Sequence, residues 1–185
     1  MIDFIKEVHH SDKNDWDAKI HCKCNQNIGC DQSEPQHQFP QTALLSCGQG
    51  GRAAFTNVND PSTIVGRVII DTRGIPKPTV GIQFSSVINF LALFTGAVGR
   101  LDFELFRACD NSNPMLLNTW TYEIFRIEGA PGDFDAFRFS KSFGFNFCEC
   151  ASCTGLCEYF VKVSVTNVFV ATLLVDNVHI TALAQ

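Results

Sequence analysis

Two clusters of cysteine residues carry the most specific chemistry that this sequence makes possible. Three cysteines lie in a polar segment near the N-terminus, and four more lie within ten residues of the C-terminal third, at Cys22, Cys24, Cys30, Cys148, Cys150, Cys153 and Cys157. Cys47 and Cys109 bring the total to nine. Clustered cysteines bind metal, perform redox catalysis or cross-link chains. The choice among these three chemistries largely decides the function.

Metal binding and redox catalysis fit the C-terminal cluster less well than cross-linking does. Cys150 and Cys153 have the spacing of a partial zinc or iron–sulfur ligand set, but a Cys-x-Cys pair such as Cys148 and Cys150 suits a single ion poorly. A redox Cys-x-x-Cys motif opens a helix whose dipole lowers the thiol pKa, whereas this motif lies between two segments with a strand pattern. We therefore expect no metal and no cofactor, with a cysteine-cluster metal-binding protein as an alternative.

Cross-linking agrees with the number and distribution of the thiols. Nine is an odd number, so one chain cannot pair all of its cysteines internally. An arm of about forty residues extends on the order of 130 Å and can therefore reach another molecule. We expect intermolecular disulfides, with Cys47 as a further disulfide candidate. The connectivity stays open, and the intermolecular candidates are Cys22, Cys24, Cys30, Cys109, Cys148, Cys150, Cys153 and Cys157.

The elements that must position these cysteines are predicted to be β-strands. In residues 137–147, phenylalanine occupies odd positions and mostly polar residues occupy even ones, which is the period of a strand with one buried face. Residues 159–165 repeat the pattern. Eight or nine such runs, separated by turn residues, predict an all-β, jelly-roll-like β-sandwich, with an immunoglobulin-like sandwich as second choice. We expect the C-terminal cysteine cluster in the loop between two strands.

The composition of the chain changes near Pro40. Residues 1–41 contain four of the five histidines and many amide and charged side chains, but few aliphatic ones. This composition predicts a flexible, cysteine-containing N-terminal arm or connector, followed by a β-sandwich domain over residues 42–185.

Several functional classes are disfavoured by the sequence. The formal net charge of -5 argues against a nucleic-acid partner. The chain has no apolar run of the roughly 18 residues that a membrane span needs, and no signal-peptide-like start, so we expect neither membrane insertion nor signal-dependent export. No nucleophile, base and orienting residue form a recognisable set, so we expect no catalytic residues and no enzyme. A ligand-binding module would use Trp120 and Tyr122 to stack on a sugar, although their alternation favours core positions.

A series of short motifs resembles a small family of uncharacterised proteins from spore-forming clostridia. The resemblance extends from about residue 41 to the C-terminus. The motifs that carry it are Leu44-Leu-Ser-Cys-Gly-Gln-Gly50, Gly81-Ile-Gln-Phe-Ser-Ser86, Phe103-Glu-Leu-Phe-Arg-Ala-Cys-Asp110, Asn118-Thr-Trp-Thr121, Phe145-Asn-Phe-Cys-Glu-Cys150 and Cys153-x-x-x-Cys157. This family is a domain of unknown function, so the resemblance implies little about mechanism.

The layout of the chain is also similar to that of the endospore appendage pilins of bacilli. In those proteins a jelly-roll subunit carries a cysteine-bearing N-terminal arm that bonds to subunits further along a fibre. The resemblance implies a self-assembling structural subunit that forms a helical filament of identical copies at the spore or cell surface. Release by lysis of the mother cell would explain the absence of an export signal. The alternative is a jelly-roll module that binds a glycan or another ligand.

Overall fold

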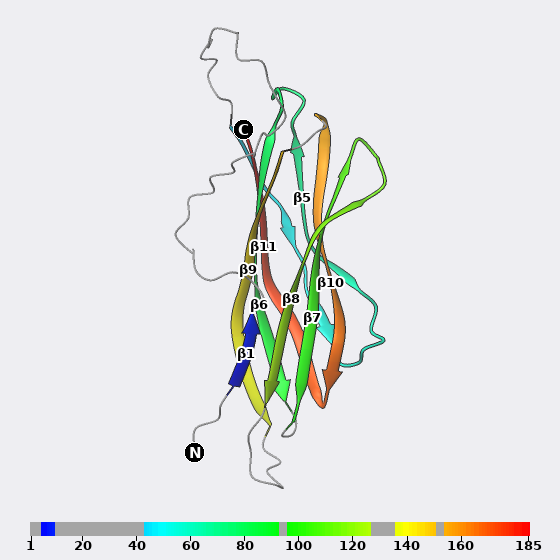
Figure 1. Ribbon diagram of the computed structural model, residues 1–185, viewed down its shortest axis with the longest axis vertical. Helices are drawn as coiled ribbons and strands as arrows, with labels where there is room; N and C mark the ends of the chain where they lie inside the picture. Colours follow the sequence, from blue (N-terminus) through cyan, green and yellow to red (C-terminus); the bar gives the residue numbers. More distant parts are fainter. Residues whose placement is uncertain (1–4, 10–42, 93–95, 127–135, 151–153) are drawn as a thin grey trace.

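The structure is a two-layered β-sandwich in which every strand pair is antiparallel (Figure 1). This computed structural model describes residues 5–9, 43–92, 96–126, 136–150 and 154–185. Over these residues the chain forms eleven strands and no helix. The strands are β1 (Ile5–His9), β2 (Leu44–Cys47), β3 (Gln49–Gly50), β4 (Ala53–Phe55), β5 (Thr63–Asp71), β6 (Thr79–Ala92), β7 (Val98–Cys109), β8 (Met115–Arg126), β9 (Phe137–Cys150), β10 (Leu156–Phe169) and β11 (Ala171–Ala184).

The strand order is that of a jelly roll. One sheet has the order β1-β8-β7-β10-β5-β3, and the other has the order β2-β11-β6-β9 with β4 also paired to β11. Strands β4 to β11 therefore form the two four-stranded orders β4-β11-β6-β9 and β5-β10-β7-β8, which a jelly roll requires. The predicted all-β, jelly-roll-like sandwich is confirmed. The two strands that the sequence pattern did not predict, β1 and β3, contain five and two residues.

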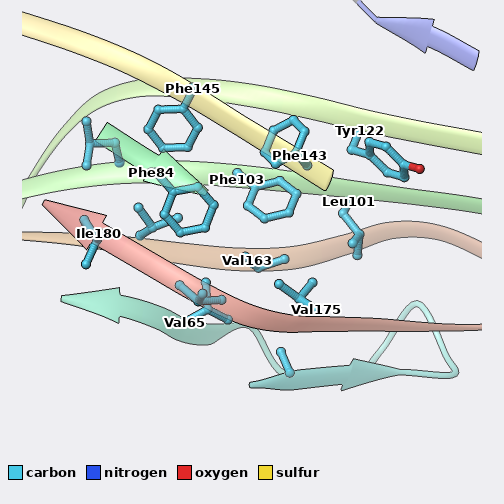
Figure 2. Packing of buried hydrophobic residues seen from close by; sticks show 14 of the residues in the cluster. Val65, Phe84, Leu101, Phe103, Tyr122, Phe143, Phe145, Val163, Val175 and Ile180 are labelled. Carbon is cyan, nitrogen blue, oxygen red and sulfur yellow. The ribbon is translucent and has the colours of Figure 1, made fainter. Parts of the chain in front are cut away.

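Aromatic side chains from both sheets fill the space between the layers (Figure 2). The odd-numbered phenylalanines of β9 face inward, as their period predicts, and Phe143 and Phe145 are buried. The Phe143 ring lies 4.3 Å from that of Phe103 on β7, and the Phe145 ring lies 4.9 Å from that of Phe84 on β6. Trp120 of β8 stacks on Phe145 at 3.7 Å. These contacts fix β9 against the core of the sandwich.

One flank of the sandwich is closed by short strands that change sheets. We call residues 44–55 the closed flank, because β2 and β4 pair with β11 in one sheet while β3 pairs with β5 in the other. Glycine makes this crossing possible. A Cβ atom on Gly48 would lie 2.2 Å from the carbonyl oxygen of Arg67, and one on Gly50 would lie 1.9 Å from that of Val178.

The opposite flank is formed by β8 and β9, and we call it the open flank. β9 is the terminal strand of the five-stranded sheet, and β8 is followed outward only by the five-residue β1 among the described strands. Residues 1–4 and 10–41 of the predicted arm lie outside the described residues, as does the predicted domain boundary between residues 41 and 42.

The expected position of the C-terminal cysteines in a loop is wrong. Cys148 and Cys150 belong to β9, and Cys157 belongs to β10, while Cys153 lies outside the described residues. The pairing of β9 with the fourteen-residue β6 continues as far as Cys150, opposite Thr79. The ladder therefore adds to the strand residues 148–150, which the sequence pattern assigned to the connection.

Candidate functional site

Cys109 and Cys157 form a disulfide within the chain. They lie directly opposite each other on β7 and β10, the two central strands of the six-stranded sheet, and both face the core. The bond joins residues 48 positions apart. Because each sulfur is bonded to the other and is buried, this pair is an internal staple, and neither cysteine is available to another chain while the bond is intact.

Asp110 fixes the chain around this disulfide. Asp110 and Asn111 have positive φ angles, and the Ser112 amide donates to the Cys109 carbonyl at 2.8 Å, so residues 109–112 form a tight turn of the type that Asp and Asn favour. The Asp110 carboxylate accepts a hydrogen bond from the Leu156 amide at 3.0 Å. The beginning of β10 is thus held to the end of β7 beside the disulfide.

Cys148 and Cys150 have different surroundings. Both are exposed on β9, and both are disulfide-bonded. A regular strand separates residues i and i+2 by about 6 to 7 Å with parallel side chains, whereas the Cβ atoms of a disulfide are only about 4 Å apart. These two cysteines therefore do not bond to each other, and their partners lie outside the described residues. Cys22, Cys24, Cys30 and Cys153 also lie outside the described residues.

Between these two cysteines, Glu149 connects the two sheets. Its side chain points inward from β9, where it accepts a hydrogen bond from Arg107 Nη1 at 2.8 Å and another from the Tyr159 hydroxyl at 2.5 Å. Arg107 and Tyr159 are paired residues of β7 and β10, each two positions from a cysteine of the internal disulfide. The Arg107 and Glu149 side chains are each only 12% exposed. This ion pair fixes the end of β9 to the part of the core that carries the Cys109–Cys157 bond.

Sequence reasoning missed this ion pair, although a signal for it exists. Glu149 continues the odd, inward-facing series of Phe143, Phe145 and Phe147, and Arg107 continues that of Leu101, Phe103 and Leu105. Opposite charges at inward positions of two strands indicate a buried ion pair, because an isolated buried charge is costly. The sequence pattern identifies the face of each residue, but not the partner across the sandwich.

Cys47 ends β2 and is exposed with a free thiol. It lies opposite Thr181, which pairs with Gln83, which in turn pairs with Asn146 on β9. Directly opposed residues share a face, so Cys47 lies on the same outer face as Cys148 and Cys150, at the other edge of the sheet. The described cysteines that are not buried therefore share one face of the sandwich.

Among the described residues, neither the metal site nor the sugar-stacking pair that the sequence suggested is formed. Within the described part of the chain, no three His, Cys, Asp or Glu residues are grouped so that they could hold a metal ion. Likewise, those residues contain no helix long and apolar enough to cross a membrane. Trp120 packs on Phe145 and Phe147, and Tyr122 is buried, which raises its pKa to about 12. Tyr122 therefore belongs to the core, and Trp120 packs against that core, so neither belongs to a sugar-binding surface.

Comparison with known proteins places this geometry in a family. The family model described as Domain of unknown function (DUF4489) matches residues 41–185. The chain belongs to the DUF4489 family. The matched residues of this DUF4489 protein contain the whole jelly roll and the cysteines at positions 47, 109, 148, 150, 153 and 157. No curated protein matches the chain.

Two solved structures are similar to the DUF4489 protein at a low level. Eiger TNF from S. frugiperda has 11% identity and a TM-score of 0.32, and the match covers 77% of this chain and 92% of that one. The CBM22-1 xylan-binding domain of Paenibacillus barcinonensis Xyn10C has 14% identity and a TM-score of 0.23, with coverage of 74% and 91%. TM-scores this low carry no inference about function.

Proposed function

We propose that this DUF4489 protein is a structural, self-assembling subunit of an extracellular fibre at the spore surface, cross-linked by disulfides between copies. The observation that supports this proposal best is the pair Cys148 and Cys150. Both are exposed on a terminal strand, and each forms a disulfide with a cysteine of the same chain that lies outside the described residues. Bonds at this exposed position are accessible to thiol–disulfide exchange with the cysteines of another copy.

The proposed linkage uses the N-terminal arm. The arm carries Cys22, Cys24 and Cys30, and its length allows it to reach a neighbouring molecule. A cysteine of one copy that bonds to β9 of another creates a head-to-tail contact, and such a contact produces an open helical filament when its rotation does not close a ring. The proposal assigns no catalytic step and no cofactor to the protein.

The contacts of Glu149, which lies between Cys148 and Cys150, support this proposed role. Glu149 holds the segment between Cys148 and Cys150 against Arg107 and Tyr159, so a pull on either sulfur is transmitted to the interlayer core rather than to a loop. The internal Cys109–Cys157 bond lies two residues away along both strands. In a subunit under tension, these contacts would stabilise the part of the body at which the force is applied.

Electron microscopy of the oxidised full-length protein tests the proposal. We expect filaments, together with ladders on non-reducing SDS gels that reductant collapses to monomer. The variant Cys22→Ser/Cys24→Ser/Cys30→Ser should lose the ladders and keep the circular dichroism spectrum of the body. Monomer with free thiols under oxidising conditions would contradict the proposal.

A ligand-binding module is the second candidate, and one observation favours it. Phe106 and Phe160 stack at 5.2 Å on the outer face of the six-stranded sheet, and Lys162 Nζ lies 4.9 Å from the centre of the Phe106 ring. Partly exposed aromatic rings provide a stacking surface for a flat apolar or sugar ligand. Calorimetric binding of a glycan by the monomer, abolished by Phe106→Ala/Phe160→Ala, would support this function over assembly.

A further inference from the structure

The open flank is completed by a strand from outside the family domain. β1 pairs antiparallel with β8 from Ile5 opposite Arg126 to His9 opposite Tyr122. The DUF4489 model begins at residue 41, so β1 does not belong to the jelly roll that it extends. In Figure 1, β1 lies beside the end of β8, and residues 10–42 separate it from the body along the sequence.

β1 covers only part of the edge that β8 presents. It pairs with residues 122–126, whereas residues 115–121 of β8 have no strand on that side within the described chain. Met115 and Leu116, at the uncovered end, are exposed apolar residues. An exposed strand edge with apolar side chains accepts further strands, which is the basis of association by β-augmentation.

From this geometry we propose that β1 is an exchangeable strand, so that in the assembled fibre β1 of one copy pairs with β8 of its neighbour. This inference rests on the proposed function, since it names the segment that joins successive subunits. In the free monomer, β1 covers the edge of its own β8. In the fibre, the same five residues make the same backbone pairs with an identical strand of another copy, as in domain swapping.

The length of the connection makes the exchange feasible. Thirty-three residues, 10–42, join β1 to the described body. A chain of that length reaches about 110 Å when it is fully extended. The twelve-residue β8 is about 40 Å long. The connection therefore reaches the β8 edge of a neighbour that packs against the open flank.

Local concentration decides between the two pairings, because the bonds themselves are the same. Within one chain, the covalent connection gives β1 an effective concentration on the order of millimolar at its own β8. In dilute solution the concentration of other copies is far below this effective concentration, so their β1 strands do not compete. In a fibre, neighbouring β8 edges are held at fixed short distances, so the advantage of pairing within the chain disappears. We therefore expect exchange to accompany assembly and to be absent from the free monomer.

A mixture of two cysteine variants of the full-length chain tests the exchange. Val8 lies opposite Glu123 in the register, so Val8→Cys on one chain and Glu123→Cys on another can bond only if β1 is exchanged. We expect this bond in fibres assembled from an equal mixture and oxidised, identified by mass spectrometry of the linked peptides. The matched control pairs Val8→Cys with Thr119→Cys, a position on the same strand outside the β1 register, and should give no link.

The outcomes separate this inference from the proposed function. Fibres that lack the interchain bond, while a single chain carrying both substitutions forms it internally, would overturn the exchange and leave the fibre proposal intact. Interchain bonds in closed dimers without fibres would support the exchange and contradict the fibre. The absence of both fibres and interchain bonds would overturn the strand exchange and the fibre proposal together.

Discussion

Cys109 and Cys157 lie on the two central strands of one sheet, whereas Cys148 and Cys150 lie on the terminal strand of the other. The first two are buried and bonded to each other. The second two are exposed and bonded beyond the described residues. The same side chain thus differs in role with its position: the central pair stabilises the body, and in the proposed function the terminal pair attaches the body to another copy.

Removal of the central pair should have the largest effect on stability. A disulfide that closes a loop of 48 residues contributes about 4 kcal/mol through the entropy of the unfolded chain. We expect Cys109→Ala/Cys157→Ala to lower the free energy of unfolding of the monomer by about that amount, measured by urea denaturation. A loss below about 1 kcal/mol would show that the central pair does not act as a staple.

Glu149 links the two pairs, and its neutralisation should have the next largest effect. Glu149→Gln leaves the Arg107 guanidinium without its counter-charge in a site where the Arg107 side chain is 12% exposed. We expect a loss of about 2 kcal/mol and faster amide hydrogen exchange at the end of β9. The matched control is Glu158→Gln, because Glu158 pairs with Arg67 where the side chains are 30% and 52% exposed. That exposed pair should contribute less than about 1 kcal/mol, and equal losses in the two variants would contradict the special role of Glu149.

Removal of the terminal pair should affect cross-linking far more than the fold. Cys148→Ser/Cys150→Ser replaces exposed side chains, so we expect the free energy of unfolding of the body to change by less than about 1 kcal/mol. The SDS-resistant ladders should disappear. The matched control is Cys47→Ser, which removes an exposed thiol from the same outer face at the other edge of the sheet and should retain the ladders. Loss of the ladders in Cys47→Ser alone would move the linkage from β9 to β2.

The smallest effect is expected for a chemical probe of the oxidised monomer. Cys47 is free and exposed, whereas the other four described cysteines are disulfide-bonded. Iodoacetamide should modify Cys47 without denaturant, detected by peptide mass spectrometry, with no measurable change in stability. Cys109 and Cys157 should be modified only after reduction and unfolding. Their modification in the native protein without reductant would contradict the division into a buried and an accessible set.

The sequence predicts the faces of these residues better than their partners. The odd-numbered phenylalanines of β9 and the alternation of β7 indicate strands, burial and a jelly roll, because period two depends only on neighbouring residues. The bond between Cys109 and Cys157 depends on the register of β7 against β10, which joins distant parts of the chain. The contact of Glu149 with Arg107 crosses from one sheet to the other, so it also depends on how distant parts of the chain are placed. β1 was not predicted because its five residues form a strand only against an existing edge.

The most direct test of the central claim is the isotopic origin of the disulfides made by Cys148 and Cys150. Fibres are assembled from an equal mixture of ¹⁴N- and ¹⁵N-labelled chains and digested without reduction, and the linked peptides are weighed by mass spectrometry. The account predicts peptides that join Cys148 or Cys150 of one label to an arm cysteine of the other, while the Cys109–Cys157 peptides carry a single label. Disulfides of a single label at all of these positions would contradict it.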